Sequence, residues 1–397
     1  MHCELSASDI LAEIQTESLQ TFLTSVRHET SSAGSTYIPA LDRHLSTANV
    51  SRTSHGWPLN RGDVIEVQGP AASGKTQFLC HMLLTCLMPS QHQGIHLGGW
   101  SKAAILFDTD GKFSTSRLHE LLVSRLSRLL GRDSPHYTNV TIDLEDLATR
   151  CLENLHIFRP TSSAQLAITL IHLPNYHATN SRLQTTEIGI LAIDSLSAFY
   201  WRDRYSLEQL RDATDGSSHA TLPPNPLYYV VKALQEFRAS HRPVILLSNW
   251  GLNAFSKPSA PGEPESPFYR QHLHPFPAPF EAHGAAEAIS NIQNSQRERS
   301  ASVDPSRDSP AGPARRQADV TRLPLHYHIT LHPAPIDPFP ASYALAEAIA
   351  QEHMRAALVN KGEIRGLLRT PGSSDVREFA FRIGDREIFV HEPERTP

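Results

Sequence analysis

The feature that most constrains this chain is the stretch Gly69-Pro-Ala-Ala-Ser-Gly74-Lys75-Thr76, which matches G-x-x-x-x-G-K-[ST] at every fixed position. Residues 64–67, Val-Ile-Glu-Val, precede it and predict a strand, and the largely apolar residues 77–84 follow it and predict a helix. In this setting the backbone N–H groups of the loop surround phosphates, and the helix N-terminus favours negative charge. The alternative is a glycine and serine turn between two core elements, which the strand–loop–helix context disfavours.

The motif assigns a role to each part of the loop. Lys75 is expected to reach the β- and γ-phosphates of ATP, and the Thr76 hydroxyl is expected to ligate Mg²⁺. The predicted nucleotide contacts are Gly69, Pro70, Ala71, Ala72, Ser73, Gly74, Lys75, Thr76 and Gln77.

A phosphate loop also needs a carboxylate to hold Mg²⁺ through water, at the end of a neighbouring buried strand. Asp194 follows the apolar run 190–193 and fits that place. Asp often ends a strand at a turn, but the phosphate loop upstream favours the metal role.

Strand 103–107 ends in Asp108-Thr109-Asp110, where a carboxylate could orient water or act as its base. For Asp108 a helix cap before Ser114 is equally plausible, whereas for Asp110 we favour the catalytic role. Strand 243–248 ends with Ser248 and Asn249, which are candidates for sensing the γ-phosphate because ligands bind at the carboxyl ends of parallel strands.

Other polar residues have a stronger structural explanation. Arg202 and Arg204 follow three aromatic residues and could contact a single nucleic-acid strand, yet a packed helix start with solvated arginines explains them slightly better. His326, His328 and His332 lack a third ligand type nearby, so strand-face histidines are favoured over a metal site.

From residue 61 onward, strands and helices alternate, which predicts an α/β fold with a mainly parallel twisted sheet and helices on both faces. The strands read as near-continuous apolar runs, as expected when both sheet faces are covered. The predicted strands are 64–68, 103–108, 154–158, 188–193 and 243–248. The predicted helices are 75–88, 114–130, 162–173 and 226–240.

Two regions depart from this rhythm. Residues 7–27 have apolar residues at helical spacing, and residues 252–322 form a long proline-rich insert that we expect to be disordered. After the insert we expect a strand at 323–331, a helix at 341–358 and a terminal hairpin with arms 379–383 and 386–390 around Gly384-Asp385.

Composition limits the function classes. The net charge of −5 argues against a general polyanion-binding surface, so nucleic-acid contacts would be local or supplied by a partner. The four cysteines show neither metal-ligand nor disulfide spacing, and no apolar run approaches a membrane span. We therefore expect a soluble intracellular protein without membrane contacts.

These motifs resemble the eukaryotic RecA-like recombinase family in its paralogue branch. The resemblance rests on Arg61-Gly-Asp-Val-Ile-Glu-Val-Gln-Gly-Pro with Gly74-Lys75-Thr76-Gln77, and on Ile38-Pro-Ala-Leu-Asp42, which resembles the segment before the core there. It covers residues 35–250 well and 321–391 more loosely. It implies four parts: an N-terminal helical segment (1–34), a RecA-like P-loop ATPase core (35–251), the insert (252–322) and a C-terminal completion of the core (323–397).

The resemblance also implies a role in homologous-recombination repair of DNA double-strand breaks in the nucleus. Such paralogues assemble with one another and support recombinase loading on single-stranded DNA. The expected partners are other paralogues, the D-type paralogue above all, with single-stranded or branched DNA contacted through the complex.

Two positions depart from the family pattern. Asp110 stands where the active recombinase has a catalytic glutamate, and its side chain is one methylene shorter. Trp250 stands where the recombinase has a glutamine that senses the γ-phosphate, and an indole cannot accept a hydrogen bond. The resemblance therefore implies at most a weak DNA-dependent ATPase.

Two other P-loop functions stay open. A small-molecule or nucleotide kinase normally carries an arginine-rich lid after the core, and the arginines of this chain are scattered there. A GTPase is suggested by Asn360-Lys-Gly-Glu363, which resembles a guanine-recognition tetrad but ends in Glu and lies after a predicted helix, far from the core strands.

Overall fold

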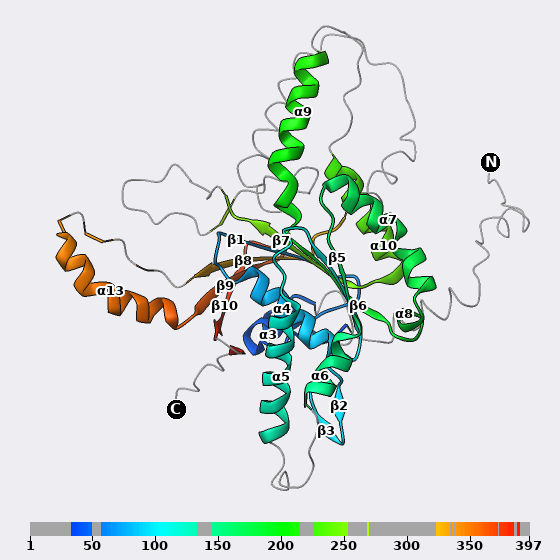
Figure 1. The fold of residues 1–397 in the computed structure, drawn as a ribbon, viewed down its shortest axis with the longest axis horizontal. Helices are drawn as coiled ribbons and strands as arrows, with labels where there is room; N and C mark the ends of the chain where they lie inside the picture. Colours follow the sequence, from blue (N-terminus) through cyan, green and yellow to red (C-terminus); the bar gives the residue numbers. More distant parts are fainter. Residues whose placement is uncertain are drawn as a thin grey trace, which may run out of the picture.

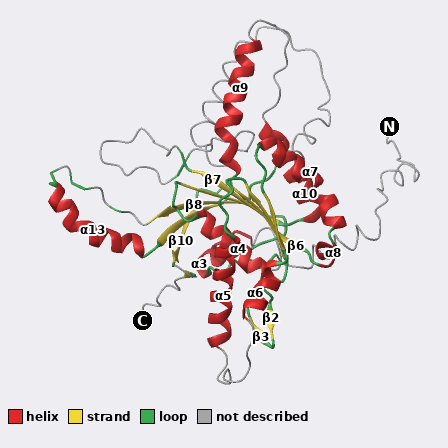
Figure 2. Ribbon diagram, in the orientation of Figure 1, coloured by secondary structure: helices red, strands yellow, loops and turns green. Residues whose placement is uncertain are grey.

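The computed structural model describes residues 33–49, 57–132, 144–214, 226–252, 268–269, 323–333, 336, 339–340, 342–371, 373–384 and 387–389. The predicted N-terminal helix and most of the proline-rich insert lie outside these residues. Figures 1 and 2 show the fold as a twisted sheet with helices on both of its faces. The predicted α/β fold class is confirmed.

Within the described residues, the main sheet has nine strands in the order β11-β10-β9-β8-β1-β7-β6-β4-β5. The six strands from β8 to β5 run parallel, whereas β8–β9, β9–β10 and β10–β11 pair antiparallel. The strands are β1 (Val64–Gly69), β4 (Ala103–Asp108), β5 (Leu155–Phe158), β6 (Ile188–Asp194), β7 (Val244–Trp250), β8 (Tyr327–Pro333), β9 (Glu363–Arg369), β10 (Val376–Ile383) and β11 (Ile388–Phe389), with a separate hairpin of β2 (Gln91–His92) and β3 (Ile95–His96).

Helices connect the parallel strands, as the alternating pattern predicts. They are α3 (Pro39–Asn49), α4 (Lys75–Leu87), α5 (Thr115–Arg132), α6 (Leu144–Leu152), α7 (Ser163–Thr179), α8 (Ser181–Thr185), the 3-10 turn η1 (Leu196–Phe199), α9 (Tyr200–Thr214), α10 (Pro226–His241) and α13 (Leu345–Asn360). None of the described helices is long and apolar enough to span a membrane.

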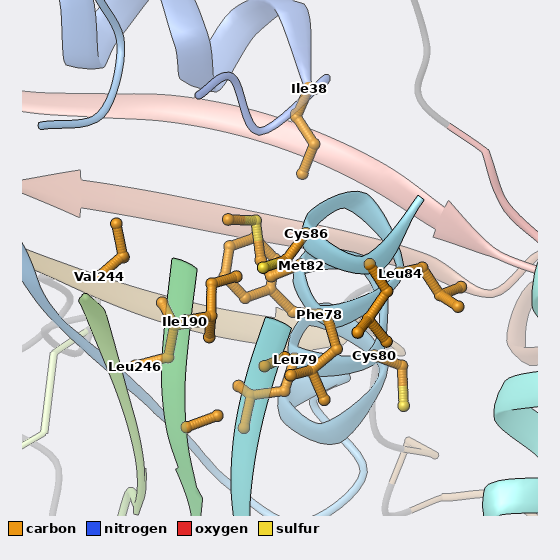
Figure 3. Close-up of a cluster of buried hydrophobic side chains, with 14 of the residues drawn as sticks. Ile38, Phe78, Leu79, Cys80, Met82, Leu84, Cys86, Ile190, Val244 and Leu246 are labelled. Carbon is orange, nitrogen blue, oxygen red and sulfur yellow. The ribbon is translucent and has the colours of Figure 1, made fainter. Parts of the chain in front are cut away.

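Alternate side chains of the central strands enter two separate apolar cores. Val244 and Leu246 of β7 belong to the core under α4, which Figure 3 shows, whereas Ile245 and Leu247 belong to the core under α7 and α10. The period-two alternation of a strand explains this division. Because both faces are apolar, the strands read as continuous hydrophobic runs.

Helix α7 is longer than predicted. The sequence predicts an end at residue 173 because Pro174 follows, but the helix continues to Thr179. Its later turns are held by tertiary packing: the Tyr176 ring stacks edge-on against Phe158 at 5.2 Å, and its hydroxyl lies 2.8 Å from His156 Nδ1. Packing of the later turns offsets the hydrogen bond that proline removes.

The predicted terminal hairpin is present as β10 and β11, but the sequence did not predict β9, which pairs with β10 on its other side. The main partner of β10 is β9, which is paired from Glu363 to Arg369, while β10 and β11 share only two residue pairs. The sequence does not predict β9, because this strand begins shortly after a helix ends and contains Gly366. A Cβ at Gly366 would lie 2.3 Å from Phe379 Cζ, so the glycine makes room for that ring.

On the face opposite α4, residues of β1, β7, β8 and β9 form a buried polar cluster. We define this polar cluster as Glu66, Gln68, Asn249, His328, Thr330 and Arg369, all at most 8% exposed.

Within the polar cluster, His328 Nδ1 lies 3.1 Å from Arg369 Nη2 and His328 Nε2 lies 3.2 Å from Gln68 Oε1. Phe268 and Tyr269 of the insert lie over this region: the Arg369 guanidinium is 3.8 Å from the Phe268 ring centroid, and Tyr269 stacks on His332. This part of the predicted insert therefore packs against the sheet.

Candidate nucleotide-binding site

The phosphate loop lies between β1 and α4, at the carboxyl edge of the parallel strands. Gly69 is tightly enclosed, since a Cβ there would lie 2.4 Å from Ser73 Oγ and 2.5 Å from the Leu331 carbonyl oxygen. Ala72 and Gly74 have positive φ values of 60° and 83°. Gly74 caps α4 without a side chain, which leaves the first N–H groups of the helix available to an anion.

The Lys75 side chain folds back over the loop. Its ammonium donates to the carbonyl oxygens of Gly69 at 2.9 Å and Pro70 at 2.6 Å. Burial lowers the pKa of Lys75, and the carboxylates of Asp194 and Asp110 oppose that shift. The ammonium is therefore already held at the mouth of the loop, where the motif expects it.

The predicted magnesium ligands meet. Thr76 Oγ1 donates to Asp194 Oδ2 at 2.7 Å, although the two residues are 118 positions apart. Ser248 Oγ donates to the other carboxylate oxygen at 2.5 Å. A hydroxyl and a carboxylate at the phosphate edge are the oxygen ligands that Mg²⁺ prefers, so these residues fit the ion.

The remaining loop residues line the same edge. Ala71 and Ala72 are exposed, and Pro70 is half-buried. Gln77, in the first turn of α4, has a buried Oε1 atom without a hydrogen-bond partner among the described residues. An unsatisfied buried acceptor beside a phosphate loop is compatible with a ligand at this place.

The two aspartates after β4 have different environments. Asp108 is buried and accepts from the backbone N–H of Lys112 at 3.1 Å and from Arg159 Nε at 3.2 Å. It therefore supports the loop that leads into α5. Asp110 is exposed, and its pKa is raised, mainly by partial burial of its carboxyl group. Its catalytic role stays a prediction.

At the end of β7, the two residues predicted to sense the γ-phosphate, Ser248 and Asn249, point to opposite faces of the sheet. Ser248 faces Asp194, whereas the Asn249 amide donates to Glu66 Oε1 at 2.7 Å in the polar cluster. Successive strand residues point to opposite faces, so the prediction for Asn249 is wrong. The Trp250 backbone N–H donates to Ser197 Oγ at 3.0 Å, and Trp250 pairs with Gly69, the first loop residue.

Sequence reasoning missed one contact on the β4 side of the site. Thr109 Oγ1 donates to the Ser195 carbonyl oxygen at 2.7 Å, and the Thr109 N–H donates to the Asp194 carbonyl oxygen at 3.0 Å. These bonds tie the loop that carries Asp110 to the strand end that carries Asp194. The position of Thr109 between two acidic residues at a strand end is the one signal for this role in the sequence.

The arginines after β6 are exposed on α9, as the structural explanation predicts. Arg204 Nε donates to Glu208 at 2.9 Å, and Arg202 donates to the Thr161 carbonyl oxygen. Trp201 and Tyr205 are exposed beside them.

The residues that suggested a GTPase lie elsewhere: Asn360 ends α13, and Glu363 begins β9. Strand β9 is two strands away from β1.

Comparison with known proteins gives several relatives, including the following three. The DNA repair protein XRCC2 homolog of Arabidopsis thaliana is 29% identical over 208 residues, which cover 48% of this chain and 55% of that protein. The DNA repair protein XRCC2 of Mus musculus is 27% identical over 206 residues, or 52% of this chain and 62% of that protein. The DNA repair protein rhp57 of Schizosaccharomyces pombe is 27% identical over 251 residues, or 62% of each.

The matched regions span less than two thirds of the length of these relatives. No family model matches the chain. The stretches that point most specifically within the family are residues 106–110, 194–204 and 381–389, and they indicate X-ray repair cross-complementing protein 2. The predicted resemblance to the eukaryotic RecA-like recombinase paralogues is therefore confirmed, and XRCC2 proteins are among the proteins that this chain resembles.

Proposed function

We propose that this chain is an ATP- and Mg²⁺-binding subunit of a recombinase-paralogue assembly. The observation that carries the proposal is the contact of Thr76 Oγ1 with Asp194 Oδ2 at the mouth of the phosphate loop. A phosphate loop and a metal-holding carboxylate have to share one ion, and 2.7 Å between their oxygens meets that requirement.

The relatives, whose names describe DNA repair proteins, support the proposed biological role. We place the chain in the nucleus, in homologous-recombination repair of double-strand breaks. There it assembles with other RecA-like paralogues, the D-type paralogue first, and supports recombinase loading on single-stranded DNA. Single-stranded or branched DNA is contacted through the complex.

Nucleotide turnover is weak in this proposal. Asp110 replaces a longer acid at the position of the catalytic glutamate, and Trp250 replaces the glutamine that senses the γ-phosphate. In the structure, the Asn249 amide donates a hydrogen bond to Glu66, so Asn249 does not replace the glutamine as a γ-phosphate sensor. ATP then serves mainly to fix the conformation of the subunit, because binding energy stabilises whichever state holds the ligand.

ATP binding is tested by titrating a fluorescent ATP analogue with Mg²⁺ into the full chain. Lys75→Ala removes the ammonium that reaches the phosphates and should weaken binding about 100-fold. The matched control is Lys232→Ala, an exposed lysine of α10. Equal affinities for the wild type and Lys75→Ala would reject the nucleotide site.

Assembly is tested separately by co-expressing the chain with a D-type paralogue and measuring how much of each co-purifies. The wild type should form a stable complex, and Lys75→Ala should form less of it if ATP stabilises the binding conformation. A chain that binds ATP but no recombinase paralogue would contradict the assembly role alone.

A further inference from the structure

A cavity of about 250 Å³ lies on the α4 side of the sheet. Its walls come from α4, α5, residues 96–98, Tyr37 and the start of β11, and none of its lining residues belongs to the phosphate loop. Leu84 on its wall is eight residues beyond Thr76, roughly 12 Å along the axis of α4. The cavity is therefore a site separate from the nucleotide edge. Its apolar lining is Leu84, Leu97, Leu121, Leu129 and Ile388.

One cation in this wall has no negative partner in contact. Arg125 is only 9% exposed, and its Nη1 atom donates to Thr85 Oγ1 at 3.0 Å. Within the described part of the chain this is its one hydrogen bond, and no carboxylate oxygen lies within ion-pair distance of it. A buried guanidinium with five donors and a single neutral acceptor is unfavourable without a counter-charge. Burial accordingly lowers the pKa of Arg125 to about 10, and Arg128 contributes to the shift.

The nearby acid is already engaged. Glu387 Oε2 forms an ion pair with Arg128 Nε at 2.9 Å, and Glu387 Oε1 accepts from Ser124 Oγ at 3.0 Å. Its charge therefore offsets that of Arg128, although at longer range it also favours the charged form of Arg125. The charges of Arg125, Arg128 and Glu387 sum to one positive charge at the cavity.

The other polar wall groups do not supply an anion. His81 is fully buried, and its Nε2 lies 2.7 Å from the Thr36 carbonyl oxygen, to which it must donate. Burial lowers the pKa of His81 to about 3, so the ring is neutral at pH 7. Tyr37 places its ring 6.0 Å from the Arg125 guanidinium, and His96 is exposed at the rim.

We propose that this cavity binds one carboxylate carried on an apolar body, with the carboxylate paired to Arg125 and the body packed against the leucines. The planar fork of arginine matches a carboxylate in two parallel hydrogen bonds. A single negative charge balances the cavity, whereas a dianion would be repelled by Glu387. The volume is below the roughly 300 Å³ of small drug-sized pockets, which suits one aromatic acid or one to two side chains.

The carboxylate can come from a free small acid or from an acidic side chain beside an apolar one in a peptide. The free probe is 3-phenylpropionate, and its neutral counterpart is 3-phenylpropionamide. The peptide probe is acetyl-Gly-Glu-Phe-Gly-amide, with glutamine in place of glutamate as its counterpart. Binding of all four is measured by ligand-observed NMR and calorimetry on the full chain.

The wild type should bind each acid about tenfold more tightly than its neutral counterpart, because only the acid pairs with Arg125. Arg125→Met should abolish that preference. The control is Arg150→Met, an exposed arginine of α6 that is paired with Asp146 at 3.0 Å. Tighter binding of the peptide would identify a protein side chain as the source, and tighter binding of the free acid would identify a small molecule.

Three results would overturn the proposal: neither acid binds, acid and amide bind equally, or Arg125→Met leaves the acid preference intact. The first two use the wild type alone, so they remain decisive if the variant does not fold. The site is independent of ATP, and a failure here leaves the proposed nucleotide function untouched.

Discussion

The two ends of the nine-stranded sheet are built differently. Strands β1, β7, β6 and β4 are buried on both faces, and α4 buries ten of its thirteen residues against them. At the other end, β9 to β11 run antiparallel, and α13 has no buried residue among its sixteen. Figure 1 shows α13 extending away from the sheet.

The difference explains where the candidate site lies. Parallel strands joined by helices bring all their carboxyl ends to one edge, so Gly69, Asp194 and Ser248 meet there although they are far apart in sequence. The antiparallel end alternates strand directions and creates no such edge. Its contribution is Arg369 of the buried polar cluster and the packing of Ile364 and Ile383 beside Gly74 of the loop.

The largest expected effect tests whether stability resides in the parallel end. Leu246→Ala removes a fully buried side chain of β7 and should lower the free energy of unfolding by about 3 kcal/mol. Leu358→Ala, on α13 where the leucine is 42% exposed, should change it by less than about 0.5 kcal/mol. Urea denaturation followed by circular dichroism measures both, and equal losses would erase the contrast between the two ends.

A second prediction concerns the antiparallel end itself. Gly366→Ala places a Cβ against the Phe379 ring and should cost about 2 kcal/mol. Gly131→Ala in α5 meets nothing within 4 Å and serves as the control, with a small gain expected from helix propensity. In a double-mutant cycle, Phe379→Leu should relieve part of the Gly366→Ala penalty; strict additivity would show that the ring is not the cause.

The third prediction uses the buried histidine of the α4 face. The pKa of His81 is lowered from 6.5 to about 3 in the folded chain, so between these values the unfolded chain binds the proton more readily. The stability contributed by neutral His81 is therefore full above pH 6.5 and is lost as the pH falls below it. At pH 5.5 the loss should be about 1.4 kcal/mol.

The comparison variant for that prediction is His81→Gln, which should remove this part of the pH dependence between 7.5 and 5.5. The exposed His172→Gln should leave the slope as it is. Urea midpoints at each pH provide the measurement, and an unchanged slope in His81→Gln would show that the buried ring does not control acid sensitivity.

The smallest effect concerns the position of the metal carboxylate. Ser248→Ala removes the hydroxyl that donates to Asp194 Oδ1 and should weaken Mg²⁺–ATP binding about fivefold, the equivalent of about 1 kcal/mol, because the lost hydrogen bond affects binding only through the position of the carboxylate. Ser240→Ala on the surface of α10 should have no effect. If the loss persists when Mg²⁺ is removed by a chelator, Ser248 acts through folding and not through the metal.

Much of the parallel end could be predicted because its signals are local. The continuous apolar runs define β1, β4, β6 and β7 to within two residues, and the glycine pattern defines the loop. The meeting of Thr76 and Asp194 followed from topology, since β1 leads to the phosphate loop and β6 ends in Asp194 at the same edge of the sheet, with β7 between them.

The errors have a common physical origin in tertiary contacts. Pro174 indicates a helix end, but packing of Tyr176 extends α7 beyond it. Gly366 argues against a strand when the sequence is read alone. The glycine is needed because the Phe379 ring, thirteen residues further along the chain, packs against it. Asn249 and Ser248 look alike in sequence, and only the register of β7 with its neighbours decides which of them faces Asp194.

The contacts of Phe268 and Tyr269 have a practical consequence for trimming the chain. The proline-rich connection between β7 and β8 returns to the sheet at these two residues, which rest on Arg369 and His332. A shortened version made for crystallisation should therefore keep them and cut only between 271 and 321. Removing the whole stretch would also remove the two aromatic rings that cover Arg369 and His332.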